Sequence, residues 1–249
     1  MDKNYYHEYF ELERTHWWFL ARTKILETQI VQLLKDTPNA SILNIGAATG
    51  ASSEMLSKFG KVTSIEYEAE CIAFVKDKIS FTIEEGTILD LNYPENSFDL
   101  VCAFDVVEHV AEDELALKEM HRVCKINGHV ILTVPTFMSL WSKHDEVNHH
   151  VKRYQLNELK ALVQPTLEPV FLSYFNTWLF LPIYLVRQFS NALPNMVKRS
   201  GSGSDFGLVK SQFINTFFYK LFVSENWFLR KRISLPIGVS ALAIWKKKA

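Results

Sequence analysis

One stretch of this chain decides its fold: Asn44-Ile45-Gly46-Ala47-Ala48-Thr49-Gly50. It follows the short apolar run 41–43 and precedes residues 51–56, which have the composition of a helix start. A strand that ends in small residues and then enters a helix is typical of a turn that holds a cofactor, because small side chains let a ligand approach the backbone closely. The free N–H groups and the positive dipole end of the helix then point at any anionic group bound there.

On either side of this turn, strand-like segments alternate with helix-like segments. Gly60, Gly86 and Pro135 separate several of them. This alternation predicts βαβ units, and therefore an α/β fold with a mostly parallel sheet and helices on both faces. The predicted strands are 41–46, 61–66, 81–85, 98–104 and 129–134, and the predicted helices are 5–36, 51–59, 69–78 and 112–124.

After Pro135 the pattern changes. Residues 136–154 are polar and rich in histidine, a helix at 155–163 and a strand at 167–174 resume the alternation, and 238–245 has the pattern of a last strand. The intervening segment is dense in Phe, Trp, Leu and Tyr and contains the Ser/Gly run 200–204, which has the composition of a flexible linker. We therefore expect an N-terminal helical cap (1–38), a core (39–174), an aromatic helical insertion or lid (175–232), and a last core strand with a basic tail (233–249).

Composition excludes several classes of protein. The chain has 27 basic and 28 acidic residues, and this near-neutral balance predicts no nucleic-acid partner. Its three cysteines form no paired framework and its first residues have no signal-peptide pattern, which together predict a cytoplasmic protein. No apolar stretch reaches the roughly 18 residues that a membrane-spanning helix needs.

The spacing around the turn narrows the choice of cofactor. The dinucleotide pattern G-x-G-x-x-G is not met, because only Ala47-Ala48-Thr49 separates Gly46 from Gly50, and no Gly-Lys-Ser/Thr follows as in a phosphate loop. Glu66 ends the second predicted strand, where a carboxylate can accept hydrogen bonds from both hydroxyls of a ribose. A ribose clamp without a pyrophosphate cradle favours a phosphate-free nucleoside such as S-adenosylmethionine. The alternative is an ordinary βα turn with an unrelated surface glutamate.

Four stretches in this order, 42–50, 62–66, 97–110 and 128–135, give the chain a family resemblance. It resembles the class I S-adenosylmethionine-dependent methyltransferases (methyltransferase type 11), in the group that includes the ubiquinone-pathway O-methyltransferases. The resemblance implies a Rossmann-like sheet of seven strands, with the last strand antiparallel, and S-adenosyl-L-methionine as cofactor. The turn departs from the family pattern at two positions: Asn44 replaces the usual acidic residue, and Ala48 replaces a glycine.

The resemblance also implies a set of cofactor-binding residues. Arg22, near the end of an aromatic stretch in the first helix, is expected to hold the methionine carboxylate, since a guanidinium pairs well with that group. Glu66 is expected to bind the ribose, and the loop after the third strand to lie against the adenine. The complete expected set is Trp18, Arg22, Asn44, Gly46, Ala47, Gly50, Glu66, Tyr67, Thr87, Ile88 and Phe104.

Acidic and histidine residues after the fourth and fifth strands are the candidates for proton removal. We expect Asp105, His109 and His149 to be catalytic, with a neutral imidazole acting as general base near pH 7. In some relatives an E-x-x-E-H arrangement similar to residues 105–109 binds magnesium, but we assign no metal ligand here. The simpler interpretations are that Glu108 and His109 fix the strand-to-helix connection, and that an Asp145–Arg153 pair stabilises the loop.

The aromatic insertion has two open interpretations. It forms a helical cap over the active site, or it presents a lipid-facing surface, with residues 230–232 and the lysine-rich tail meeting anionic lipid. We expect methyl transfer to an oxygen of a small-molecule, sugar or lipid-linked acceptor, with peripheral membrane contact as a further possibility. The alternatives are a non-catalytic protein that binds the cofactor and a nicotinamide-dependent reductase.

Overall fold

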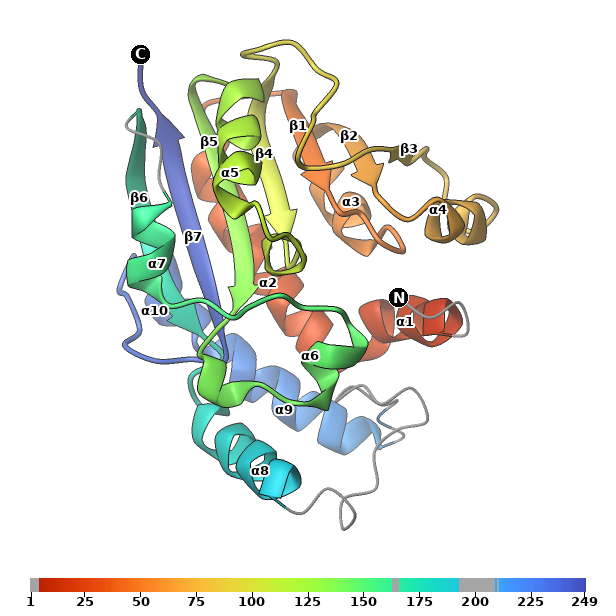
Figure 1. Ribbon diagram of the computed structural model, residues 1–249, viewed down its shortest axis with the longest axis vertical. Helices are drawn as coiled ribbons and strands as arrows, with labels where there is room; N and C mark the ends of the chain where they lie inside the picture. The colour runs from red at the N-terminus through yellow and green to blue at the C-terminus, as the bar shows by residue number, and fades with distance from the viewer. Residues whose placement is uncertain (1–4, 163–165, 193–208, 210) are drawn as a thin grey trace.

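The computed structural model describes residues 5–162, 166–192, 209 and 211–249. Its strands form a single sheet in the order β3-β2-β1-β4-β5-β7-β6 (Figure 1). β7 runs antiparallel to both of its neighbours and the other pairs are parallel, which confirms the predicted seven-stranded, mostly parallel sheet. The strands are β1 (Ala40–Ile45), β2 (Gly60–Glu66), β3 (Glu84–Glu85), β4 (Phe98–Phe104), β5 (Cys124–Pro135), β6 (Leu167–Phe175) and β7 (Ser240–Lys247).

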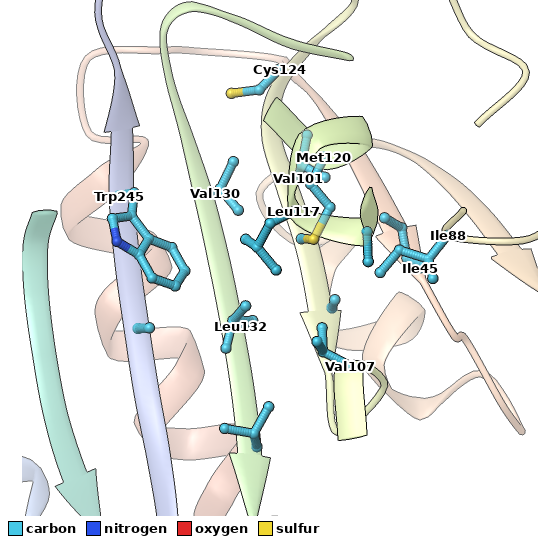
Figure 2. Packing of buried hydrophobic residues seen from close by; sticks show 14 of the residues in the cluster. Ile45, Ile88, Val101, Val107, Leu117, Met120, Cys124, Val130, Leu132 and Trp245 are labelled. Atoms are coloured by element: carbon cyan, nitrogen blue, oxygen red, sulfur yellow. The ribbon is translucent and has the colours of Figure 1, made fainter. Parts of the chain in front are cut away.

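Helices cover both faces of the sheet because successive residues of a strand point to opposite sides. Val101 and Ala103 of β4 pack with α5 (Asp113–Val123) and α7 (Leu156–Ala161), in the cluster of Figure 2. Leu100 and Cys102 pack on the other face with α2 (Trp17–Leu33), α3 (Ala51–Leu56), α9 (Gln212–Ser224) and α10 (Asn226–Arg230). The near-continuous apolar sequence of β4 follows from its burial on both faces.

The N-terminal segment is two helices rather than the one that we predicted. α1 (Tyr5–Thr15) and α2 are separated by His16, whose backbone is extended (φ −80°, ψ 134°) and whose Nδ1 accepts a hydrogen bond from the Trp18 N–H at 3.2 Å. His16 therefore caps α2, as a side-chain acceptor at a helix start does. The break turns α1 toward the carboxyl ends of β1 and β2 (Figure 1).

Two strand boundaries also differ from the prediction. β3 contains only Glu84 and Glu85, whereas β5 begins at Cys124, earlier than the predicted residue 129. Phe98 pairs with Cys124 but Leu100 pairs with His129, so residues 125–128 form an irregularity within the β4–β5 ladder. A bulge of this kind lets a strand continue past residues that favour a turn.

The basic tail and α8 (Phe180–Ala192) lie at opposite ends of the strands (Figure 1). Lys247 belongs to β7, and its Nζ donates to the carbonyl oxygens of His121 (2.8 Å) and Cys124 (2.9 Å), at the start of β5. The tail and α8 therefore lie at opposite ends of the sheet, and a lipid-facing surface that includes the tail stays a prediction.

The aromatic insertion packs against the core through α9. The ring of Trp17 on α2 lies 5.3 Å from that of Phe218, and the ring of Phe175 lies 6.0 Å from that of buried Phe222. The predicted 200–204 linker lies outside the described residues, and the proposed domain boundaries remain predictions. Among the described residues, no helix is both long enough and apolar enough to cross a bilayer.

Candidate active site

A cavity of about 690 Å³ lies where the carboxyl ends of the parallel strands meet. Gly46, Glu66 and Asp105 line it, and each lies at or just after the end of its strand. β1 pairs with both β2 and β4, and this switch point is where open α/β sheets bind ligands. The volume is within the range of small-molecule pockets.

Two walls of this cavity are built differently. The first, which we name the turn wall, comprises the turn 46–50, Glu66, the loop 86–88 and the cavity-lining residues of α1 and α2. The second, the histidine wall, comprises residues 105–112, which include the short helix η1 (Val107–His109), and residues 144–153, which include α6 (Lys143–Val147). Arg187 of α8 also lines the cavity.

The turn requires small residues for two separate reasons. Gly46 and Gly50 have φ angles of 69° and 93°, and residues that carry a Cβ rarely adopt such positive values. A Cβ at position 46 would in addition lie 2.4 Å from Cγ2 of Val106. Ala48 also has a positive φ, 46°, so this alanine occupies the left-handed conformation at a cost of about 1 kcal/mol.

Glu66 connects the turn to the cavity. Its Oε2 accepts a hydrogen bond from the Ala48 N–H at 2.8 Å, and its Oε1 accepts from the N–H groups of Tyr67 (3.0 Å) and Glu68 (3.1 Å). Three backbone donors therefore hold the carboxylate in one orientation at the cavity wall. A carboxylate so fixed has lone pairs left for the hydroxyls of a ligand.

Some predicted cofactor residues of the turn do not line the cavity. Asn44 is fully buried, and its Nδ2 donates to the hydroxyls of Ser52 and Ser53, both at 2.8 Å, so its side chain connects β1 to α3. Ala47 and Gly50 also lie behind the cavity surface. The other predicted residues line it: Trp18, Arg22, Gly46, Glu66, Tyr67, Thr87, Ile88 and Phe104.

An ion pair joins α2 to the end of β4 at this cavity. Arg22 is buried, and its Nη2 lies 2.6 Å from Oδ2 of Asp105. Its guanidinium carbon lies 5.4 Å from the ring centre of Trp18 and 5.6 Å from that of Phe104. The hydroxyl of Thr133 donates to Asp105 at 3.1 Å. Two residues that we predicted for different roles, Arg22 and Asp105, are thus direct partners.

A buried network supports the histidine wall. Oδ1 of Asp145 lies 2.8 Å from Nδ1 of His150 and 2.8 Å from Nε of Arg153. The predicted Asp145–Arg153 pair is therefore present, and it also orients a histidine. Burial alone raises the pKa of Asp145, but the His150 hydrogen bond and the Arg153 charge outweigh it and hold the pKa below its usual range.

Glu108 is buried in the same wall, whereas the neighbouring His109 is exposed. Partial desolvation of its ring and the adjacent His150 lower the pKa of His109 to about 4, so its imidazole is neutral near pH 7. Burial, assisted by the Asp105 charge, raises the pKa of Glu108 well above its usual range. Both Glu108 oxygens are buried and have no hydrogen-bond partner within the described part of the chain.

Ligand atoms of Glu108, His109 and His150 lie within 4.8 Å of one another, so this set could hold a divalent cation. The raised pKa of Glu108 works against that use, because metal binding needs the deprotonated carboxylate.

The adjacent histidines do not lie as the sequence suggested. His149 has a φ of 58° rather than an extended backbone, and its side chain is exposed at the cavity rim. The ring of His150 instead lies 4.7 Å from that of His109. A catalytic role for His149 stays a prediction, and His150 is a site residue that sequence reasoning passed over.

Glu13 is a second residue that sequence reasoning missed. It is buried, lines the cavity and accepts a hydrogen bond from the Thr49 hydroxyl in the turn. Its position on α1 continues the stripe of Tyr6, Tyr9 and Phe10 at helical spacing. A carboxylate in an otherwise aromatic stripe is the signal that could have identified it.

Comparison with known proteins adds a family to this geometry. Residues 43–132 match a family model described as "Methyltransferase domain". The chain is 30% identical over 98 residues to the phosphatidylethanolamine N-methyltransferase of Cereibacter sphaeroides, covering 36% of this chain and 48% of that protein. It is 31% identical over 104 residues to the demethylmenaquinone methyltransferase of Staphylococcus epidermidis, covering 38% and 43%.

Among solved structures, a SAM-dependent methyltransferase from Archaeoglobus fulgidus superposes with a TM-score of 0.56 at 14% identity, covering 96% of this chain and 99% of that one. This likeness supports the fold alone. The aligned region spans less than half the length of each of the two curated relatives. The matched domain, residues 43–132, includes the turn, Glu66 and the end of β4, and S-adenosylmethionine is the methyl donor of the matched family. Residues 43–132 are thus similar to a methyltransferase domain, and the strand order of the sheet is that of the class I S-adenosylmethionine-dependent methyltransferase fold.

Proposed function

We propose that this protein transfers a methyl group from S-adenosylmethionine to an oxygen atom of an acceptor bound at the histidine wall. The observation that carries the proposal is the placement of Glu66. Its carboxylate is fixed by three backbone N–H groups at the cavity wall, twenty positions after the first glycine of the turn. The two ribose hydroxyls of the cofactor are suitable donors to such a group.

Each wall then has one part of the task. On the turn wall, Glu66 binds the ribose, residues 86–88 lie against the adenine, and Arg22 binds the methionine carboxylate. The cofactor supplies an activated methyl group on a sulfonium. The protein therefore contributes alignment of the acceptor oxygen with that methyl group and removal of one proton.

The histidine wall offers the general base. Nδ1 of His150 is held by Asp145, which leaves Nε2 as the atom that takes the acceptor's proton. The buried Arg153 keeps Asp145 ionised and in place, so a positive charge forming on His150 has a fixed counterion. His149, the base that we expected from sequence, is the competing candidate.

Calorimetry tests cofactor binding. Glu66→Ala should weaken S-adenosylmethionine binding by about 100-fold, because two hydrogen bonds to a charged group are lost. Glu85→Ala is the matched control, since Glu85 pairs in register with Glu66 across β2 and β3 but is exposed and outside the cavity. Equal affinities of wild type and Glu66→Ala would contradict the assignment.

Label transfer tests catalysis. Incubation of a cell extract with methyl-labelled cofactor should label one acceptor class in the presence of the wild type, and a protein that only binds the cofactor would label none. With the labelled acceptor in hand, His150→Ala should lose far more activity than His149→Ala. A larger loss of activity in His149→Ala than in His150→Ala would identify His149 as the general base.

A lipid-linked acceptor is favoured by the exposed face of the aromatic insertion. Leu181 of α8 and Phe213 and Phe217 of α9 are 62%, 81% and 55% exposed. α8 also supplies Arg187 to the cavity, so the apolar face and the site share a helix. Both curated relatives are named for lipid substrates, phosphatidylethanolamine and demethylmenaquinone. Exposed apolar patches of this kind suit a lipid surface.

Vesicle flotation tests this second part of the proposal. The wild type should float with anionic vesicles, and the double variant Phe213→Ser/Phe217→Ser should stay with the unbound fraction. Ile126→Ser is the control, because Ile126 is also exposed but lies at the opposite end of the sheet. Absence of flotation by the wild type would leave a water-soluble acceptor.

A further inference from the structure

The methionine part of S-adenosylmethionine carries an ammonium group, and none of the residues discussed so far is assigned to bind it. We propose that Glu13 of α1 binds this ammonium group, a role that rests on the function proposed above. The chain lacks the acidic residue usual at the start of the turn, because Asn44 stands there and its side chain is directed at α3. Glu13 brings a carboxylate to the same turn from a different element.

The position of Glu13 is defined by contacts with the turn. The Thr49 hydroxyl donates to it, and Glu13 lines the main cavity together with Arg22. The next residue, Arg14, fixes α1 in this place: its Nη2 lies 2.7 Å from Oε1 of Glu54 in α3 and 3.2 Å from the carbonyl oxygen of Thr49. α1 is therefore attached to the turn that the cofactor would contact.

The other carboxylates of the cavity have other partners or surroundings. Asp105 is paired with Arg22, and both oxygens of Glu66 accept backbone N–H groups. Glu68 and Glu112 are exposed at the rim, where water and salt screen their charge. Glu108 is buried, and burial raises its pKa well above the usual range, which disfavours its charged form.

The nearest counterion of this buried carboxylate is distant, because Nη1 of Arg14 lies 4.0 Å from Oε2 of Glu13. Burial raises the pKa of Glu13 to about 7, and the Thr49 hydrogen bond and the charges of Arg14 and Arg22 offset only part of that rise. A cation that enters the cavity and reaches Glu13 would supply the missing charge. The proposed ammonium subsite thus explains why an acid occupies a buried position in an aromatic stripe of α1.

Comparing the binding of two ligands distinguishes an ammonium-binding role of Glu13 from a purely structural one. S-adenosylhomocysteine carries the ammonium group, whereas 5′-methylthioadenosine has the same nucleoside and thioether but no amino-acid part. Glu13→Gln keeps the size of the side chain and its ability to accept from Thr49. It should weaken S-adenosylhomocysteine binding by about 10- to 100-fold and change methylthioadenosine binding by less than twofold.

Two further variants complete the calorimetric experiment. Glu11→Gln, an exposed change on the same helix, should alter neither affinity. Thr49→Val, which removes the hydroxyl that orients Glu13, should weaken S-adenosylhomocysteine binding alone and by less than Glu13→Gln does.

The outcomes are distinguishable. Equal losses for both ligands in Glu13→Gln would show a structural role for Glu13 and overturn the subsite, as would unchanged S-adenosylhomocysteine binding. A wild-type protein that binds neither ligand would overturn the proposed function itself. Retained methylthioadenosine binding serves as the check that Glu13→Gln is folded.

Discussion

The turn wall and the histidine wall face the same cavity, but different interactions hold them in place. The turn wall depends on backbone conformation: positive φ angles at Gly46, Ala48 and Gly50, and N–H groups that hold Glu66. The histidine wall depends on side chains, with Asp145 buried between His150 and Arg153. The family match, residues 43–132, covers the turn and the end of β4 but stops before the 144–153 loop and α8. The family match thus covers most of the proposed cofactor site, while part of the proposed acceptor site lies outside it.

The largest expected effect belongs to the histidine wall. Asp145→Asn should lower the free energy of unfolding by about 3–5 kcal/mol, because it leaves the buried Arg153 charge without its partner. Glu146→Gln on the same helix is the control: Glu146 pairs with Lys143 at an exposed site, so a change below about 0.5 kcal/mol is expected. Chemical denaturation measures both, and similar values for the two variants would remove the contrast between a buried and an exposed pair.

Asp145 should also make the free energy of unfolding depend on pH. The pKa of Asp145 is depressed in the folded state, so its stabilising effect is present above its unfolded pKa of about 4 and is lost as the pH falls below it. The wild type should therefore lose stability on acidification below pH 4 more steeply than Asp145→Asn. Parallel acid curves would contradict the assignment.

On the turn wall, Gly46→Ala should cost about 3 kcal/mol, because strain at a positive φ adds to the overlap with Val106. Gly86→Ala is the matched change in the loop after β3, where a Cβ would meet only ordinary contacts with Ile65. Thermal unfolding compares the two. A Gly46→Ala protein as stable as Gly86→Ala would mean that the turn relaxes freely.

Two neighbouring alanines should respond with opposite signs. Ala48→Gly should raise the free energy of unfolding by up to about 1 kcal/mol, because it relieves a left-handed conformation. Ala47→Gly should lower it by a similar amount, since Ala47 is not among the residues with positive φ and glycine adds only chain entropy. If both changes destabilise, φ at position 48 is not a source of strain.

The smallest expected effect concerns metal. Methyl transfer should be unchanged by EDTA, because the raised pKa of Glu108 disfavours the anionic carboxylate that the cluster with His109 and His150 would need to bind a cation. Activity that is lost with EDTA and restored by a divalent cation would give the histidine wall a second role.

The difference between the walls also explains what sequence could predict. Residues 98–104 could be predicted as a strand because burial on both faces requires a continuous apolar run. Glu66 could be identified because it lies at the end of the next strand, twenty positions after Gly46 of the turn. The side-chain network around Asp145 needs the tertiary fold, since His150 approaches His109 only after the left-handed residue at 149 reverses the chain. The break at His16 was hidden because a helical pattern continues on both sides of it.

The position of α1 has a consequence for ligand exchange. Tyr9 and Glu13 form part of the cavity wall, so a cofactor in the cavity contacts a helix near the N-terminal end of the chain. Local opening of α1 and release of the cofactor are then linked equilibria. A bound cofactor disfavours the opening of α1, and an open α1 weakens the binding of the cofactor. Amide hydrogens of α1 should exchange more slowly as cofactor concentration rises above its dissociation constant, while those of α7, far from the turn, keep their rates. A bound cofactor is therefore expected to stabilise α1 against local unfolding.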